Sequence, residues 1–422
     1  MKCWSRRQFG CLAGAMCLGA LRPQAARGQA KARVVVIGGG AGGATAAKYL
    51  SLGSEMLDVT LVEPKARYTT CFFSNLYLAG LRSLESLTHG YETLAQKYGV
   101  RVIHDSVTAI DPIAKNMSLE GGAKLSYDRV VLAPGIGFKA GAIEGYDDAA
   151  MQIMPHAWTA GPQTELLRQQ LESMADGGVF VLVAPPDPFR CPPGPYERAS
   201  LIAYYFKQYK PRAKILILDA KDSFFAQDVF EDGWNRHYPG MIEWLPGQFT
   251  GGIKAVDVKG RLIKTAGDTF KANVANVIPA QEAGRLAQQA RFVDQSGWCP
   301  IDPMTFESKL QSGIHVIGDA AKAGNMAKSA FASNSQAKVC AFAILAALTG
   351  SERFAPHLFN TCYTLLAADD AVTSAISYNA DPETIKVNDF FFSKVGDNAE
   401  TRREAVREAD GWYAAFTHDI FG

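Results

Sequence analysis

The apolar run at residues 34–37 predicts a buried parallel strand, and a glycine-rich turn and a helix follow it. Residues 32–37 contain four consecutive apolar residues, Val-Val-Val-Ile, which is typical of a strand buried on both faces of a parallel sheet. Residues 38–43 then read Gly-Gly-Gly-Ala-Gly-Gly, and residues 44–50 have the composition of a helix. The order of strand, glycine turn and helix indicates the first half of a dinucleotide-binding unit.

The second half of this unit ends in an acidic residue. Residues 58–62 predict another strand, and Glu63 follows it directly. In such a unit the glycines, here Gly38, Gly40 and Gly43, let backbone N–H groups approach a pyrophosphate at the start of the helix. A carboxylate in the position of Glu63 accepts hydrogen bonds from the adenosine ribose. The sequence therefore predicts a dinucleotide ligand.

Two later patterns favour FAD over NAD as this ligand. Residues 313–320 predict a strand that ends in Gly-Asp, and in the glutathione-reductase-like fold the carboxylate of this pattern, here Asp319, binds the ribityl chain of FAD. Residues 127–135 predict a strand that leads into a crossover to a second domain. Together with the glycine turn, these patterns predict an α/β flavoprotein of the glutathione-reductase-like class with two dinucleotide-binding domains.

The second of these domains is expected to lack a nucleotide. Its first strand, residues 178–183, is followed by a proline-rich loop where a second glycine fingerprint would stand. Because proline has no N–H group, this loop is unsuited to hold a phosphate. Cys191 lies in the loop, just before the next predicted helix.

These patterns give the expected domain organisation. The FAD-binding domain comprises residues 31–143 and 285–347, and a nucleotide-free domain of the same type comprises residues 144–284. Residues 348–422 are expected to form a C-terminal α+β domain that covers the flavin and meets a partner. The length of 422 residues suits two or three domains.

The first thirty residues are typical of a twin-arginine export signal. Arg6 and Arg7 precede a weakly apolar run, residues 11–21, and small residues follow up to Ala30. We therefore expect cleavage after Ala30 and a periplasmic protein. The apolar run is too short to span a bilayer, and no transmembrane segment is expected.

Charge and motif content narrow the classes of ligand and partner. The chain has 43 Lys and Arg residues against 42 Asp and Glu residues, which argues against a nucleic-acid-binding protein. The seven histidines show no metal-binding spacing, so no metal site is expected. The sequence contains no Cys-x-x-Cys-His motif, so a haem would belong to a partner chain.

Four segments carry a resemblance to a known family, namely residues 68–75, 189–200, 297–300 and 360–363. Through them the chain resembles the flavoprotein subunit of flavocytochrome c sulfide dehydrogenase and the related flavoproteins of sulfur-oxidation operons. The resemblance covers essentially the whole mature chain. It implies oxidation of sulfide, a small inorganic sulfur substrate, and transfer of the electrons to a separate c-type cytochrome subunit.

The resemblance also implies roles for four residues. Cys71 matches the cysteine that forms a thioether to the 8α-methyl carbon of FAD, which makes the cofactor covalent. Cys191 and Cys362 match a redox-active disulfide beside the flavin, and Glu197 matches the carboxylate proposed as the active-site base. Hydrosulfide would attack this disulfide, leaving a persulfide on one sulfur and a thiolate on the other.

Expected roles can also be given for three further residues, Lys328, Cys299 and Cys340. Lys328 follows the Gly-Asp strand, and we expect it to place positive charge near the flavin N1 and C2 oxygen, where reduction adds negative charge. Cys299 and Cys340 are interpreted as packed thiols without a redox role.

Three other functions stay open. A sulfide:quinone reductase shares the fold and the mechanism but docks on a membrane through amphipathic helices, whereas residues 400–422 mix acids and bases and predict a solvated helix. A pyridine-nucleotide-dependent disulfide reductase would have its flavin bleached by NADH. A flavoprotein that only assists the assembly or repair of sulfur-oxidation proteins would not turn over with sulfide and cytochrome c.

Overall fold

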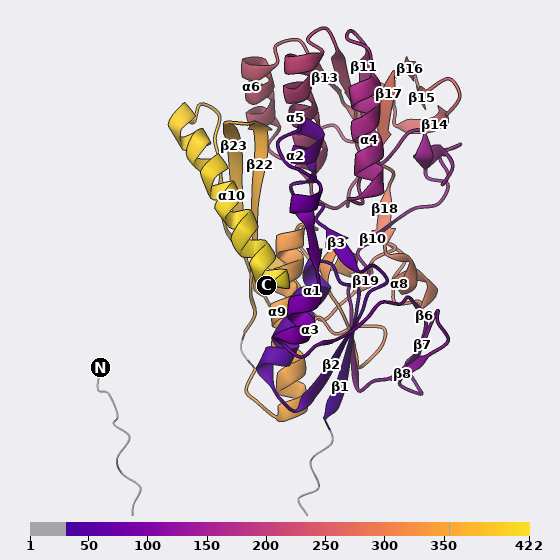
Figure 1. The fold of residues 1–422 in the computed structure, drawn as a ribbon, viewed down its shortest axis with the longest axis vertical. Helices are drawn as coiled ribbons and strands as arrows, with labels where there is room; N and C mark the ends of the chain where they lie inside the picture. Colours follow the sequence, from indigo (N-terminus) through magenta and orange to yellow (C-terminus); the bar gives the residue numbers. More distant parts are fainter. Residues whose placement is uncertain (1–30, 354) are drawn as a thin grey trace, which may run out of the picture. The chain divides into compact units, whose positions relative to one another are not determined.

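The computed structural model describes residues 31–353 and 355–422 (Figure 1). The predicted export signal, residues 1–30, lies outside the described residues. Residues 31–422 group into one unit, and three larger sheets organise it. The domain boundaries expected inside this unit stay a prediction.

The first sheet has five parallel strands in the order β20-β9-β1-β2-β5. Their bounds are β1 (Ala32–Ile37), β2 (Leu57–Val62), β5 (Arg101–Ile103), β9 (Arg129–Leu132) and β20 (Ile314–Val316). The apolar run in β1 is buried, with Val34, Val35 and Val36 at most 2% exposed, as a two-faced strand requires. Strand β20 pairs with β9, which confirms that the chain returns to its first sheet late in the sequence.

Helix α1 (Ala41–Gly53) follows the glycine turn and packs against helix α9 (Ala330–Thr349) (Figure 1). It begins earlier than the sequence pattern suggested, because the last two glycines of the turn already belong to it. Gly43 lies so close to the carbonyl of Gly38 that any side chain would collide with it. Strand and helix therefore meet without an intervening side chain, which opens the start of α1 to a ligand.

Among the described helices, only α9 is long and apolar enough to cross a membrane by length and composition, and 61% of its most apolar stretch is buried inside the chain. Its contacts with α1 and with the buried residues of the five-stranded sheet account for that apolar composition.

The second sheet has four parallel strands in the order β13-β12-β11-β17. Their bounds are β11 (Val179–Val183), β12 (Lys214–Leu218), β13 (Ile242–Leu245) and β17 (Val274–Val277). Phe180 and Leu182 of β11 face one core, and Val181 and Val183 face another. The first of these cores includes side chains from α4 (Pro162–Ser173), α5 (Gly194–Tyr209) and α6 (Gln227–His237). Burial on both faces explains why β11 is apolar throughout.

The C-terminal residues form an antiparallel sheet in the order β22-β23-β24, with helix α10 against β23. The bounds are β22 (His357–Ala367), β23 (Asp370–Ala380), β24 (Ile385–Phe392) and α10 (Ala399–Phe421). The prediction that residues 400–422 form a solvated helix was wrong. One face of α10 is buried, and its members include Ala405, Ala409, Tyr413, Phe416 and Ile420. Because these residues recur every three or four positions, they form one stripe, and most of the intermixed charges lie outside it.

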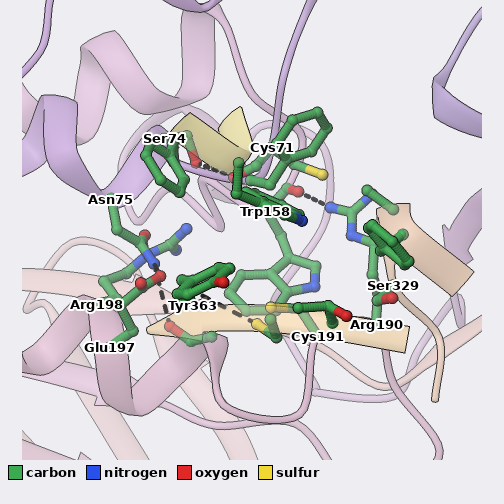
Figure 2. Close-up of a pocket in the computed structure, with 18 residues that line it drawn as sticks. Cys71, Ser74, Asn75, Trp158, Arg190, Cys191, Glu197, Arg198, Ser329 and Tyr363 are labelled. Carbon is green, nitrogen blue, oxygen red and sulfur yellow. Dashed lines mark hydrogen bonds between the residues drawn. The ribbon is translucent and has the colours of Figure 1, made fainter. Parts of the chain in front are cut away.

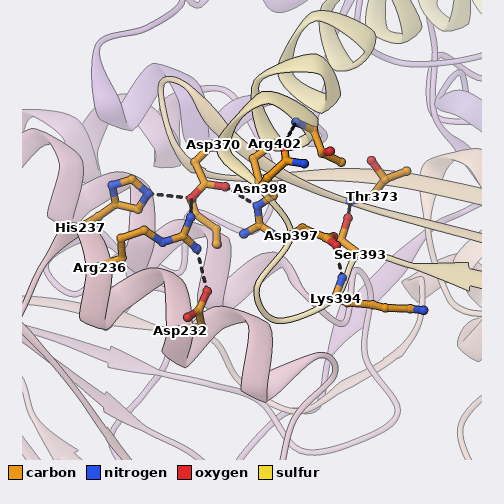
Figure 3. Close-up of polar contacts among 12 residues, drawn as sticks. Asp232, Arg236, His237, Asp370, Thr373, Ser393, Lys394, Asp397, Asn398 and Arg402 are labelled. Carbon is orange, nitrogen blue, oxygen red and sulfur yellow. Dashed lines mark hydrogen bonds and ion pairs between the residues drawn. The ribbon is translucent and has the colours of Figure 1, made fainter.

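A buried ion cluster fixes this C-terminal layer to the second sheet (Figure 3). Asp370, the first residue of β23, accepts a hydrogen bond from Nε of Arg402 in α10 at 2.6 Å. Its other oxygen lies 2.6 Å from Nε2 of His237 and 3.5 Å from the guanidinium of Arg236, both in α6. The side chains of Asp370 and Arg402 are 4% and 2% exposed. One carboxylate therefore joins three elements that are distant in the sequence.

Shorter elements complete the described chain. The helices are α2 (Ser74–Ala79), α3 (Glu92–Gln96), α7 (Gly247–Thr250), α8 (Arg285–Gln289), and the 3-10 turns η1 (Glu85–Leu87), η2 (Ala150–Gln152) and η3 (Gly318–Ala320). The strands are β3 (Arg67–Thr69), β4 (Thr88–Gly90), β6 (Val107–Asp111), β7 (Asn116–Leu119), β8 (Lys124–Ser126), β10 (Ile136–Phe138), β14 (Ile253–Asp257), β15 (Leu262–Thr265), β16 (Thr269–Lys271), β18 (Gln281–Ala283), β19 (Cys299–Pro300) and β21 (Ala321–Lys322).

Candidate active site

A cavity of about 430 Å³ lies at the carboxyl ends of β1, β2 and β9, and we call it the glycine cavity. Gly38, Gly40, Gly43 and Glu63 all line it. In a dinucleotide-binding fold the ligand lies outside the carboxyl ends of the parallel strands. The structure therefore brings these four predicted residues together in the place where the fold binds a dinucleotide.

The turn presents backbone to this cavity and holds the acidic side chain. Gly38 has a φ of +97°, which favours glycine, and a Cβ atom there would collide with the carbonyl of Ala133. Oε2 of Glu63 accepts a hydrogen bond from the N–H of Gly39 at 2.7 Å, and Oε1 accepts one from the N–H of Lys65 at 3.0 Å. These bonds fix the carboxylate at the edge of the glycine cavity.

Asp319 contributes a buried acceptor to the glycine cavity. Its Oδ1 is buried and has no hydrogen-bond partner among the described residues, and its Oδ2 lies 4.0 Å from the guanidinium of Arg190. Burial raises the pKa of this carboxyl. Because an unpaired buried acceptor is costly, a ligand hydroxyl that donates to it is expected. The glycine turn fits the pyrophosphate of FAD, Glu63 fits its ribose, and Asp319 fits its ribityl chain.

The structure does not place Lys328 in the glycine cavity. Its Nζ donates to the carbonyls of Asp319 and Ala321 at 2.7 and 3.0 Å and lies 3.7 Å from the centre of the Trp298 ring. It lines a neighbouring cavity instead, and burial lowers its pKa to about 8. The ammonium group stays at this position because the two carbonyl oxygens and the face of the Trp298 ring attract it.

A smaller cavity of about 70 Å³ adjoins the glycine cavity, and we call it the thiol cavity (Figure 2). Cys71, Arg190 and Ala330 line both cavities. Cys71 lies between β3 and α2, and its thiol is free. The thiol of Cys71 therefore lies where the two cavities meet, and its covalent bond to a cofactor stays a prediction.

Cys191 and Cys362 both line the thiol cavity, although they are far apart in the sequence. The structure contains no bond between them, and the disulfide stays a prediction. Cys191 has a φ of +59°, and its N–H donates to the carbonyl of Lys328 at 2.7 Å. A Cβ atom on Gly194, the first residue of α5, would lie 3.0 Å from Sγ of Cys191. The thiol therefore lies at the positive end of that helix.

Glu197, in the first turn of α5, lines the same cavity. Its Oε1 accepts from the N–H of Leu365 at 3.0 Å, and its Oε2 accepts from Nδ2 of Asn75 at 2.7 Å. Burial raises the pKa of Glu197 to about 7 against the opposing effect of these bonds. Burial and then the charge of Glu197 raise the pKa of Cys362 to about 12, and burial also raises that of Cys191. A carboxyl group that titrates near neutral pH beside two thiols suits proton transfer.

The rest of the thiol cavity is aromatic, with two cationic groups. Its aromatic lining consists of Phe72, Phe73, Trp158, Phe331, Tyr363 and Trp412. Arg190 and Arg198 also line it, so a small anionic ligand is favoured. The sequence analysis assigned no role to Asn75, Arg190 or Arg198. Both arginines stand in the motif around Cys191, and a charged residue beside a candidate redox cysteine was the signal available.

In the second sheet, the acidic residue equivalent to Glu63 is closed off. Asp219 follows β12 and is fully buried. It accepts hydrogen bonds from the hydroxyl of Tyr196 at 2.5 Å and from Nε1 of Trp244 at 3.0 Å, and it pairs with Lys221 at 2.6 Å. Since this carboxylate has its own partners, it is not free to accept a ribose hydroxyl. That this second domain lacks a nucleotide stays a prediction.

The two remaining cysteines line neither the glycine cavity nor the thiol cavity. Cys299 and Cys340 are buried free thiols. Within residues 31–353 and 355–422, no group of three His, Cys, Asp or Glu residues is arranged to hold a metal ion.

Three family descriptions match the chain. Residues 164–279 match the central part of the sulfide dehydrogenase (flavocytochrome c) flavoprotein chain, and residues 354–421 match the flavin-binding part of flavocytochrome c sulphide dehydrogenase. Residues 32–170 match pyridine nucleotide-disulphide oxidoreductase. The predicted resemblance is thereby confirmed.

Individual relatives extend this picture. The chain is 60% identical over 43 residues to the sulfide dehydrogenase (flavocytochrome c) flavoprotein chain of Chlorobaculum thiosulfatiphilum, a match that covers 10% of this chain and 90% of that sequence. It is 23% identical to the mitochondrial sulfide:quinone oxidoreductase of Mus musculus over 298 residues, or 68% of this chain. The match spans 65% of the length of the mouse protein.

A solved structure shows the same fold. The sulfide:quinone oxidoreductase of Aquifex aeolicus superimposes with a TM-score of 0.70 and 16% identity, over 92% of this chain and 91% of that chain. This similarity confirms the predicted α/β fold class of the disulfide-oxidoreductase-like flavoproteins.

Proposed function

We propose that this chain, which belongs to the family of the flavocytochrome c sulfide dehydrogenase flavoprotein, oxidises sulfide with Cys191 and Cys362 as its redox pair. The observation that carries the proposal is the convergence of the two thiols and Glu197 in one cavity. This thiol cavity shares Cys71 and Arg190 with the glycine cavity, so sulfur chemistry and cofactor would be neighbours.

In the oxidised protein, a disulfide between Cys191 and Cys362 presents a sulfur electrophile to the thiol cavity. Arg190 and Arg198 favour entry of the hydrosulfide anion. Hydrosulfide attacks one sulfur, the S–S bond breaks, a persulfide remains on that cysteine, and the other cysteine leaves as a thiolate. Glu197 accepts the proton of the persulfide, and the N-terminus of α5 stabilises negative charge on Cys191.

We propose FAD as the cofactor of the glycine cavity. Gly38, Gly40, Gly43, Glu63 and Asp319 would hold it, and Cys71 would bind it covalently through an 8α-thioether. When bound, FAD supplies an acceptor for two electrons that can be released one at a time. The flavin-binding family description and the unpaired Oδ1 atom of Asp319 support this assignment.

The proposed electron acceptor is a separate c-type cytochrome subunit, and the proposed location is the periplasm, reached through the signal in residues 1–30. Phe359, Phe390 and Phe391 are exposed on the sheet that carries Cys362. By the strand register Phe359 and Phe391 lie on the same face of this sheet, and neighbouring exposed apolar side chains are typical of a surface that binds a partner protein. The match to a family named for its flavocytochrome c supports the same acceptor.

Quinone is a second candidate acceptor. It is favoured by the similarity to the mouse and Aquifex aeolicus proteins, which are named sulfide:quinone oxidoreductases. The two acceptors predict different kinetics for the isolated chain, because only the quinone reductase completes a catalytic cycle without a second protein.

The test is anaerobic mixing of the purified chain with sulfide, with flavin absorbance as the readout. Wild-type flavin should be reduced rapidly, and either Cys191→Ala or Cys362→Ala should abolish rapid reduction, with little further loss in the double variant. Cys340→Ala, a change at a buried thiol of α9 away from the cavity, serves as the matched control. Reduction of the Cys191→Ala flavin within several-fold of the wild-type rate would overturn the mechanism. Turnover is then compared with a c-type cytochrome and with a soluble quinone.

A further inference from the structure

The side-chain amide of Asn75 connects Glu197 to Arg198 (Figure 2). Its Nδ2 donates to Oε2 of Glu197 at 2.7 Å and to the carbonyl of Gly194 at 3.3 Å. Its Oδ1 accepts from Nε of Arg198 at 3.0 Å. Asn75 and Arg198 are 5% and 2% exposed, so water competes little for these positions. Each end of the amide is therefore hydrogen-bonded to a charged group, and the two groups have opposite signs.

Arg198 determines which way this amide points. Three of its four other N–H groups donate to the carbonyls of His156 and Ala157 and to Oδ1 of Asn276, at 2.7–3.0 Å. A guanidinium group donates hydrogen bonds and cannot accept them, so the atom of Asn75 that faces Nε must be the oxygen. The amide nitrogen then faces Glu197. In the reverse orientation, two donors would face each other at Arg198, and Oδ1 would face the carboxylate.

We propose that Arg198, acting through the amide of Asn75, is a positioning residue that holds Glu197 in its ionised form until the sulfur pair releases a proton. The proposal rests on the proposed function, in which Glu197 accepts that proton. A donor directed at Oε2 stabilises the carboxylate, whereas an acceptor there would require a protonated carboxyl group. The orientation of one amide therefore selects the form of Glu197 that can act as a base.

The charged and titratable groups around Glu197 determine how far its titration shifts when the hydrogen bond from Asn75 is lost. Arg198 lies beside it in α5, and Cys191 and Cys362 face it from the loop before α5 and from β22. Arg190 lines the same cavity. When the bond from Asn75 is lost, the N–H of Leu365 is the remaining hydrogen-bond donor to the carboxylate among the described residues. We expect an upward shift of about one pH unit in the titration of Glu197, the size of one hydrogen bond to an ionised group.

The first readout is the pH dependence of flavin reduction by sulfide. Asn75→Ala should move the midpoint of the Glu197 titration upward by about one unit. Asn75→Asp keeps the shape of the side chain and places a second carboxyl group against Glu197, so its midpoint should move upward by at least as much. Asn334→Ala is the matched control, because Asn334 is also a buried asparagine that donates to a carboxylate, Oδ2 of Asp419 at 2.8 Å, outside this site. Its midpoint should match that of the wild type.

The second readout does not depend on sulfide or on turnover. It is the pH dependence of alkylation of Cys362 by iodoacetamide in the reduced protein, followed by peptide mass spectrometry. Because the charge of Glu197 raises the pKa of Cys362, alkylation of Asn75→Ala should be faster than that of the wild type between about pH 7 and pH 8, where Glu197 is still protonated in the variant but ionised in the wild type. The Asn334→Ala profile should not move.

The two readouts separate the inference from the proposed function. If sulfide fails to reduce the wild-type flavin, the proposed function is wrong, and the alkylation profile still tests the role of Asn75. If the wild type reacts with sulfide but Asn75→Ala and Asn75→Asp keep the wild-type midpoint, the positioning role is overturned alone. If Asn75→Ala does not fold, Asn75→Asp, which preserves the side-chain shape, tests the positioning role in its place.

Discussion

Replacing Asp370 by Asn should destabilise the fold more than any single change to the exposed charges of α10. The substitution keeps an oxygen that can accept from Arg402 but removes the negative charge that neutralises it (Figure 3). Arg402 is 2% exposed, and its Nη2 has no hydrogen-bond partner among the described residues. Removing one partner of a buried ion pair typically costs about 3 to 5 kcal/mol. We expect about 3 kcal/mol for Asp370→Asn, because one hydrogen bond is retained.

The measurement is the free energy of unfolding from urea titrations followed by tryptophan fluorescence. Glu404→Gln is the control on the same helix, since Glu404 pairs with Arg407 at the surface and should contribute less than about 1 kcal/mol. Burial raises the pKa of Asp370, but hydrogen bonds from His237 and Arg402 lower it on balance. The stabilisation is therefore present above the ordinary carboxyl pKa and is lost as the pH falls through the lowered value. An Asp370→Asn protein as stable as Glu404→Gln at neutral pH would refute this reasoning.

Three further predictions concern cofactor, base and export. Cys71→Ser should release all flavin on denaturation, whereas denatured wild-type protein should retain a mass increment of about one FAD, and colourless wild-type precipitate would contradict the covalent bond. Glu197→Gln should slow reduction by sulfide by about 100-fold and flatten its pH dependence near pH 7, because the group that is ionised above its pKa of about 7 is gone; stopped-flow measurements from pH 5 to 9 check this, and an unchanged pH profile would exclude Glu197 as the base. Replacing Arg6 and Arg7 by lysines should leave the precursor in the cytoplasm, which cell fractionation measures, and normal periplasmic levels would contradict the export route.

The parts of the fold that follow from short-range patterns could be predicted. The run of four apolar residues from Val34 to Ile37 is buried because such a run suits a strand that is covered on both faces. A glycine is required at position 43 because the carbonyl of Gly38 lies too close for any side chain. The acidic residues Glu63 and Asp319 follow strands, and a strand end determines which cavity they line. These relations need only the local sequence and the rules of parallel sheets.

The contacts that tune the site could not be predicted in the same way. Asn75 meets Glu197 and Arg198 only because α2 packs against α5, and no sequence period encodes that contact. The burial of α10 was missed for a related reason. Its charges dominate the sequence pattern, but Arg402 is neutralised by Asp370 from another element, and the exposed charges pair with one another along the helix. Local composition shows that charges are present and not which of them are buried.

The two sheets show how one architecture yields one nucleotide site and one closed site. Glu63 and Asp219 both follow the second strand of a parallel unit. In the first unit, the preceding turn consists of glycines, so backbone N–H groups and an open cavity lie next to Glu63. In the second unit, the loop consists largely of prolines, and Tyr196 from the helix that follows donates to Asp219 and stacks on Phe224 with 3.7 Å between ring centres. These side chains bury Asp219, while the same loop carries Cys191 to the thiol cavity. One loop therefore both places the thiol of Cys191 and lacks the glycines that a dinucleotide-binding turn would need.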